Sequence, residues 1–361
     1  MDIFHVNSNQ VTQLERLDGG PPPHGFLWID VTHDEVAADP AAWRDTIAKL
    51  TGTLVYDPHM TDVVNLSHPS YFDSTQDYAM VVFRKLALDG TGAPEEPASA
   101  RKIPPALTKL VTKPVAFLLM ENALVTVHAP NSRTIEATRA RLLEYRSKRD
   151  GSANGLRPPG SPEELMLRLL NAMVDQYLAL RQPLTGQIDR WQRALLNPSS
   201  AFKDWNALLD ARIELRKLDH LCEGQRDAMQ ELRDYMVDTM DGSQNGRIKD
   251  QMLVRVNDVM EHITRVLNHA QRLESTIESA VQIHFSAMAH RTSEIMRTLT
   301  VITALFMPLT LITGIFGMNF AVMPLLQDES GFWITIGLMA VIVAVLLVLF
   351  WRKRYLDDKD R

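Results

Sequence analysis

Residues 298–319 read TLTVITALFMPLTLITGIFGMN, and this stretch decides the fold class of the chain. It opens an uncharged run of 30 residues, Thr298–Gln327, and a second uncharged run, Ser330–Trp351, follows closely. A helix needs about 20 mainly apolar residues to cross the roughly 30 Å hydrocarbon core of a bilayer. The sequence therefore predicts two transmembrane helices joined by a short loop.

The composition of the whole chain hides these spans. A mean hydropathy of -0.12 and a net charge of -6 are typical of soluble proteins, because the apolar residues are concentrated near the C-terminus. Arg291 and Arg297 precede the first span, Arg352 to Arg354 follow the second, and the connecting loop contains no Lys or Arg. The positive-inside rule then predicts that both termini lie in the cytoplasm. The protein is accordingly expected in the inner (plasma) membrane.

The N-terminal part is predicted to be a mixed α and β domain. Short runs rich in aromatic and β-branched residues predict strands at 26–31, 78–83, 116–119 and 124–127, with a hairpin turn at Glu121-Asn122. Helices are expected at 134–148, from Pro162 onward and from Ala201 to about Met240, the last two paired antiparallel. Ser161 and Glu164 have the spacing of a capping box.

A long helix should follow these elements. From Arg247 to Met307 there is no Gly or Pro, and apolar residues recur in a heptad seam at Met252, Val256, Val259, Ile263, Val266, Ala270, Leu273, Ile277 and Ala280. Such a seam on a stalk predicts self-association. The expected segments are an α/β cytoplasmic domain at 1–150, antiparallel helices at 161–246, a stalk helix at 247–297, transmembrane helices at 298–317 and 331–351 around a loop at 317–330, and a basic tail at 352–361.

The first span carries one unusual face. Hydroxyls and glycines recur at spacings of three and four residues, at Thr300, Thr303, Met307, Thr310, Gly314 and Gly317. Two explanations are open from the residues alone. The face could pack closely against other helices, with hydroxyls bonding to their own backbone, or it could line water.

The end of this span resembles the signature of the CorA family of divalent metal ion transporters. The matching residues are Met307-Pro308-Leu309-Thr310, Gly314 to Phe320 with the Gly317-Met318-Asn319 hallmark, and Met323-Pro324. Arg291 to Glu294 and Asp258 to His262 are similar to further family motifs. The resemblance implies a CorA-like pentameric funnel, in which the chain binds copies of itself, the bilayer and divalent cations, with no nucleic-acid partner.

The resemblance also implies roles for individual residues. Gly317, Met318 and Asn319 would form the selectivity filter, and the pore would be lined by Gly314, Thr310, Met307, Thr303, Leu299, Met296 and Ser293. Asp258, and more weakly Asp89, would bind a regulatory cation in the cytoplasm. Asp328 and Glu329 could attract cations at the mouth, although Leu325 stands where the family commonly has a glutamate.

The chemistry of this filter suits Mg²⁺. Mg²⁺ holds its octahedral water shell tightly, so a ring of neutral amide and carbonyl oxygens can hold the hydrated ion without trapping it. The sequence therefore predicts a channel or transporter most suited to Mg²⁺, with Co²⁺ or Ni²⁺ as further cargo. The cation is both cargo and regulator, and no other cofactor is expected.

Two other functions were weighed. A Zn²⁺ transporter of the same architecture, proton-coupled in some relatives, is the alternative within transport. A membrane-anchored scaffold or sensor belongs to another class, but a tether would need neither the polar face nor the Gly-Met-Asn end. An enzyme is not expected, because the sequence contains no phosphate-binding loop, nucleophile and base constellation, or zinc hydrolase motif.

Overall fold

The computed structural model describes residues 1–7, 10–14, 24–87, 110–144, 158–197, 202–203, 205–239, 246–318, 325 and 330–352. The chain divides into two compact units, Met1–Glu278 and Ser279–Arg361. Each unit is described by itself below. The fold class is the predicted one: an α and β domain, a long helix, and two helices long and apolar enough to cross a membrane.

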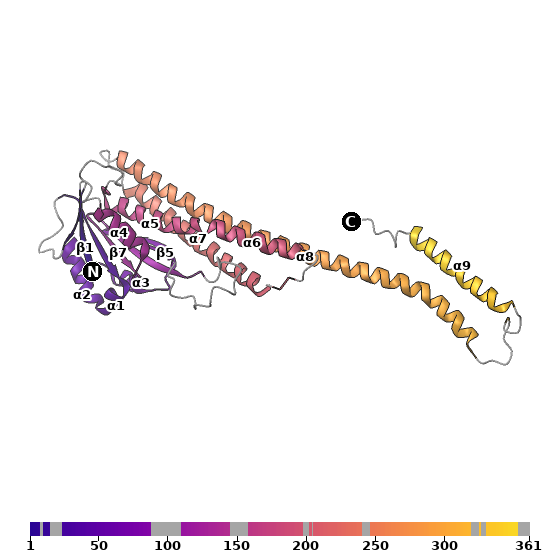
Figure 1. The fold of residues 1–361 in the computed structure, drawn as a ribbon. Coiled ribbons are helices and arrows are strands. Elements are labelled where there is room, and N and C mark those ends of the chain that lie inside the picture. Colours follow the sequence, from indigo (N-terminus) through magenta and orange to yellow (C-terminus); the bar gives the residue numbers. More distant parts are fainter. Residues whose placement is uncertain are drawn as a thin grey trace. The chain divides into compact units, whose positions relative to one another are not determined.

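The first unit is built on a seven-stranded sheet with the strand order β2-β1-β3-β7-β6-β5-β4 (Figure 1). The strands are β1 Asp2–Val6, β2 Val11–Leu14, β3 Phe26–Thr32, β4 Tyr71–Ser74, β5 Tyr78–Leu86, β6 Thr112–Met120 and β7 Ala123–His128. β3 and β7 are parallel, and all other neighbours are antiparallel. The predicted turn at Glu121-Asn122 joins β6 to β7, whereas β1, β2 and β4 were not predicted.

Helices cover both faces of the sheet. One face packs on three short helices, α1 His33–Ala38, α2 Pro40–Thr51 and α3 Asp57–Val64, through a shared apolar core. Against the other face lie α4 Arg133–Glu144, α5 Pro162–Ala179 and α7 Trp205–Thr239. The central strands are therefore buried on both sides, which explains their nearly continuous apolar sequences. The last residues of the helix predicted at 134–148 lie outside the described residues.

The predicted helix from Pro162 is in fact two helices. α5 ends at Ala179 and α6 Arg181–Leu196 begins directly after Leu180. Pro183 lies in the first turn of α6, where its missing N–H removes no helical hydrogen bond. The capping box is only half right: the Ser161 hydroxyl accepts the Glu164 N–H at 3.3 Å, but the Glu164 carboxylate accepts the N–H of Gly160 at 2.8 Å.

The longest helix, α8, runs from Gly246 to Phe316. All nine residues of its heptad seam are buried in the single chain. The part of the seam in the first unit packs within the chain, as shown by polar contacts from α5, α6 and α7 that flank it: Glu164–Arg255 3.0 Å, Asp175–His262 3.5 Å, Thr185–His269 2.9 Å and Arg216–Glu274 2.7 Å. The interpretation of the seam as a self-association surface is therefore wrong.

The second unit contains the end of α8 and α9, Gly331–Arg352. Their most apolar windows have mean hydropathies of 2.1 and 2.9, and almost none of those residues are buried in the chain. Two long apolar helices that the protein itself leaves uncovered need another apolar environment. A bilayer supplies one.

The burial of the seam gives a first prediction. Ile263 is fully buried, so Ile263→Ala is expected to lower the free energy of unfolding of the first unit by about 2 to 5 kcal/mol. Equilibrium urea unfolding of the detergent-solubilised protein, followed by tryptophan fluorescence, measures this. Val254, on the same helix and 67% exposed, provides the control, because Val254→Ala should change stability by less than about 0.5 kcal/mol. If the seam instead joined separate chains, Ile263→Ala would change only the oligomeric state.

A second prediction concerns pH. Burial, and then the charge of neighbouring His128, lower the pKa of His33 from 6.5 to about 4. The imidazole of His33 therefore binds a proton less readily in the folded chain than in the unfolded chain. The free energy of unfolding that depends on neutral His33 is fully present above pH 6.5 and is lost as the pH falls toward 4. At pH 5 the loss is roughly 2 kcal/mol. Unfolding at pH 5 and pH 7.5 should show this loss in the wild type and not in His33→Gln, whereas the exposed His24→Gln should behave as wild type.

Candidate functional site

The predicted pore face is the uncovered side of α8. All the pore-lining residues predicted from the sequence are exposed in the single chain, namely Ser293, Met296, Leu299, Thr303, Met307, Thr310 and Gly314. The less exposed residues lie about a third to half a turn away at 3.6 residues per turn, and they are Val301, Ala304, Leu305, Pro308, Leu309, Ile312 and Phe316. The hydroxyl and glycine face is therefore opposite the face that the chain itself partly covers, and it is free to meet water or other copies.

The threonine hydroxyls of this face already donate their protons in hydrogen bonds within the helix. Thr300, Thr303 and Thr310 donate to the backbone carbonyl oxygens four residues earlier, at 2.7, 2.8 and 2.9 Å. The local bonding considered from the sequence therefore exists, but it does not exclude the pore interpretation. A hydroxyl that has donated its proton keeps acceptor lone pairs. What the face can offer is oxygen acceptors, which suit a cation or the hydrogens of its water shell.

The helix ends directly before the Gly-Met-Asn tripeptide. The N–H of Gly317 donates to the Thr313 carbonyl at 2.9 Å, and that of Met318 to the Ile315 carbonyl at 3.2 Å. A Cβ on Gly317 would lie only 3.1 Å from the Thr313 oxygen, so a side chain here would crowd the last turn. The last carbonyls of a helix and the negative end of its dipole attract cations. Asn319, Asp328 and Glu329 lie outside the described residues.

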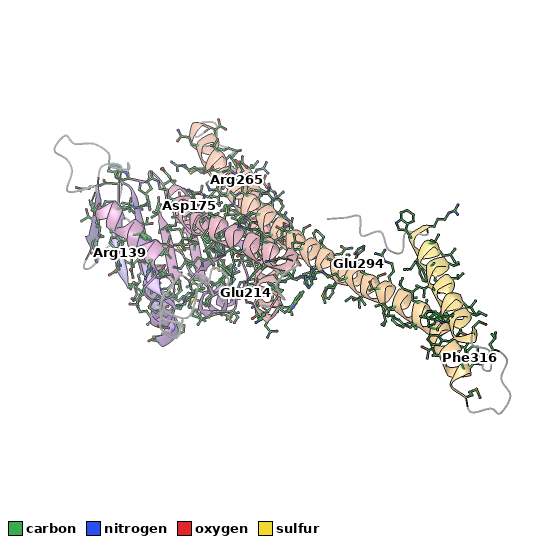
Figure 2. All side chains as sticks on the ribbon, turned by 45° about the vertical axis from the view of Figure 1, so that its right-hand side comes forward. Arg139, Asp175, Glu214, Arg265, Glu294 and Phe316 are labelled. Carbon is green, nitrogen blue, oxygen red and sulfur yellow. The ribbon has the colours of Figure 1, made fainter. Side chains whose placement is uncertain are left out.

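A second candidate site lies in the first unit, around Asp258. The Asp258 side chain is 54% exposed, and its Oδ1 lies 3.6 Å from Nε2 of His262. On the other side of that imidazole, Oδ1 of Asp175 lies 3.5 Å from Nδ1. Asp175 is on α5 (Figure 2), and Asp258 and His262 are on α8. Two carboxylates and an imidazole are all possible ligands for a divalent metal.

The arginine nearest to Asp258 along α8, Arg255, is paired with another carboxylate. Arg255 lies in the same cavity of about 300 Å³ but pairs with Glu164 at 3.0 Å. Burial alone would raise the pKa of Glu164, but the N–H of Gly160 and the charges of Arg168 and Arg255 lower it. Glu164 therefore stays ionised and holds Arg255, while Arg141 lines the same cavity as Asp175 and Asp258.

The sequence had identified Asp258 and missed Asp175. Asp258 and His262 share a motif on one helix, but Asp175 reaches them only because α5 packs beside α8. No local pattern around Asp175 marks it. The weaker candidate, Asp89, lies outside the described residues, so the structure does not place it.

Comparison with known proteins agrees with these features. A family model described as CorA-like Mg²⁺ transporter protein matches residues 24–354. The chain belongs to the CorA family. The cobalt/magnesium transport protein CorA of Thermotoga maritima is 22% identical over 299 residues, which make up 82% of this chain and 76% of that protein. This CorA-family member is thus a divalent cation transporter and not an enzyme, and its two apolar helices fit an inner-membrane protein.

Solved structures share the fold. The complete CorA magnesium transporter from Methanocaldococcus jannaschii matches with a TM-score of 0.68 at 17% identity and covers 98% of both chains. The ZntB cytoplasmic domain from Vibrio parahaemolyticus matches with a TM-score of 0.51 at 14% identity, over 78% of this chain and 98% of that domain. At these identities the likeness concerns the fold alone.

Proposed function

We propose that five copies of this chain form a pore that passes hydrated Mg²⁺, with Co²⁺ or Ni²⁺ as further cargo. The observation that carries the proposal is the exposed face of α8, which lies opposite the side that the chain itself partly covers. Its threonine hydroxyls donate their protons to backbone carbonyls and keep only acceptor lone pairs for a ligand. Five such faces around one axis would surround an ion with oxygen acceptors. Gly317, Met318 and Asn319 would form the filter at the helix ends.

The oxygen chemistry favours Mg²⁺ over Zn²⁺. Zn²⁺ prefers thiolate and imidazole ligands, and the described face contains neither Cys nor His. Hydroxyl and carbonyl oxygens are the ligands of Mg²⁺, which they would contact through its water shell. Met296, Leu299 and Met307 would provide an apolar constriction that can close by losing water. With both termini in the cytoplasm, an inward potential of 100 mV would supply about 4.6 kcal/mol per divalent cation.

We further propose that Asp258 belongs to a regulatory cation site that keeps the pore closed when cytoplasmic Mg²⁺ is high. The support is the position of the Asp258 and Asp175 carboxylates, from two different helices, on either side of His262. A bound cation would join α5 to α8 within one chain. Asp89 would add a ligand from a neighbouring copy.

Flux measurements test the transport proposal. Liposomes with the purified protein and dyes for Mg²⁺ or Zn²⁺ should show Mg²⁺ entry that does not need a pH gradient. The most informative variant is Gly314→Ala. Its added Cβ would meet nothing within 4 Å in the single chain, so the variant should fold normally. In the assembled pore the added methyl group would narrow the ion path and should reduce flux at least about tenfold.

The matched control is Gly337→Ala on α9, which has the same open space and should conduct normally. Equal flux through both variants would show that Gly314 does not face the ion. Flux of Zn²⁺ alone, or only with a pH gradient, would favour the zinc alternative, and no flux at all would favour the scaffold.

The regulatory proposal has its own test. Asp258→Asn and Asp175→Asn should each raise the internal Mg²⁺ concentration that half-inhibits flux, by about tenfold or more, since each removes a charged ligand. Glu261→Gln is the control, because Glu261 is exposed on the same helix and pairs only with Arg265 in the described structure. If internal Mg²⁺ inhibits both aspartate variants like wild type, the site has no regulatory role, whatever the pore conducts.

A further inference from the structure

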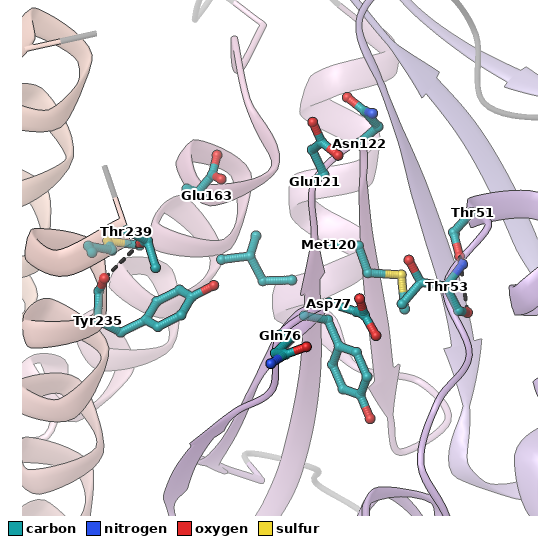
Figure 3. Close-up of a pocket in the computed structure, with 13 residues that line it drawn as sticks. Thr51, Thr53, Gln76, Asp77, Met120, Glu121, Asn122, Glu163, Tyr235 and Thr239 are labelled. Atoms are coloured by element: carbon teal, nitrogen blue, oxygen red, sulfur yellow. Dashed lines mark hydrogen bonds between the residues drawn. The ribbon is translucent and has the colours of Figure 1, made fainter. Parts of the chain in front are cut away.

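A cavity of about 690 Å³ opens at one end of the sheet in the first unit (Figure 3). It forms where several elements end or turn: the end of α2, the β4–β5 and β6–β7 turns, the start of α5 and the end of α7. None of its residues belongs to the ion pathway or to the cluster around Asp258. The cavity therefore has no role in the function proposed above.

The charge of the lining has one sign. Asp77, Glu121 and Glu163 contribute carboxylates, and no Lys, Arg or His is among the lining residues. In the described part of the chain neither Glu121 nor Glu163 forms an ion pair, and Asp77 only accepts a hydrogen bond from the Tyr56 hydroxyl at 3.4 Å. The three carboxylates come from different elements (Figure 3). A ligand that matches them must carry positive charge at more than one point.

The size of the cavity argues against a single metal ion. A cation with six waters fills roughly 200 Å³ at about 30 Å³ per water, less than a third of the space. Small-molecule sites typically measure about 300 to 1,000 Å³. The lining also includes the half-buried ring of Tyr235, whereas Leu119, Met120 and Met236 are almost completely buried behind it. A fitting ligand is therefore larger than one ion and can place part of its length against that ring.

We propose that this cavity binds a linear aliphatic polyamine. Its ammonium groups would form charge-assisted hydrogen bonds with Glu121, Glu163 and Asp77. One of its ammonium groups over the half-buried Tyr235 ring would gain a cation–π contact, and a neighbouring methylene segment would lie against the same ring. The hydroxyls and amide oxygens of the lining accept the remaining N–H groups. The ligand joins the end of α7 to the two turns of the sheet and stabilises the first unit.

Calorimetry with spermidine on the full-length protein in detergent tests the proposal. At 0.15 M salt, where exposed charges are largely screened, one spermidine should bind per chain. Glu121→Gln and Glu163→Gln should each weaken binding about tenfold or more, as should Asp77→Asn in its exposed turn. Glu136→Gln is the matched control for Glu163, because both carboxylates stand in the first turn of a helix, and it should bind as wild type.

Three results would overturn the proposal. They are the absence of saturable spermidine binding, equal affinity of the three variants and wild type, and displacement of spermidine by an equal concentration of Mg²⁺. The last would make the cavity a metal site. Thermal unfolding of each variant without ligand shows whether it is folded, and Asp77→Asn remains informative if a change at the start of α5 disturbs that helix. Transport plays no part in this measurement, so its outcome is independent of the proposed pore.

Discussion

The constraint on which the protein depends is that the polar face of α8 must meet something other than lipid. Backbone and hydroxyl groups inside a bilayer need hydrogen-bond partners, and α8 satisfies its threonine protons by bonding them to its own carbonyls. Their oxygen lone pairs and the bare backbone at Gly314 remain on the exposed side. In the proposed pore, copies packed around water would use both, whereas a single helix in lipid would use neither.

The same helix serves a different purpose in the first unit. There its apolar seam is buried by α5, α6 and α7 of its own chain, and ion pairs such as Arg216 with Glu274 flank it. Hydrogen bonds from the guanidinium groups of Arg216 and Arg212 keep the pKa of Glu274 low despite the opposing effect of burial. Because the seam is already covered, the proposed assembly of copies would use other faces of the helix.

Acidic groups in the first unit occur in two settings that differ in chemistry. Asp258 and Asp175 lie on opposite sides of one imidazole, 3.6 and 3.5 Å from its two nitrogens. Asp77, Glu121 and Glu163 instead line a cavity that is too large for one ion and partly apolar. The difference in size and lining, rather than the number of carboxylates, distinguishes the two kinds of ligand.

The sequence by itself determined the two apolar spans, the long helix without Gly or Pro, the central strands and the Gly-Met-Asn end, because each depends on periodicity or composition within a short window. It also located Asp258 through a local motif. Only the tertiary structure decided that the heptad seam is internal, that Asp175 stands beside His262, and that β1, β2 and β4 complete the sheet. Those features arise from contacts between residues far apart in the chain, and local sequence patterns carry no record of which distant surfaces pack together.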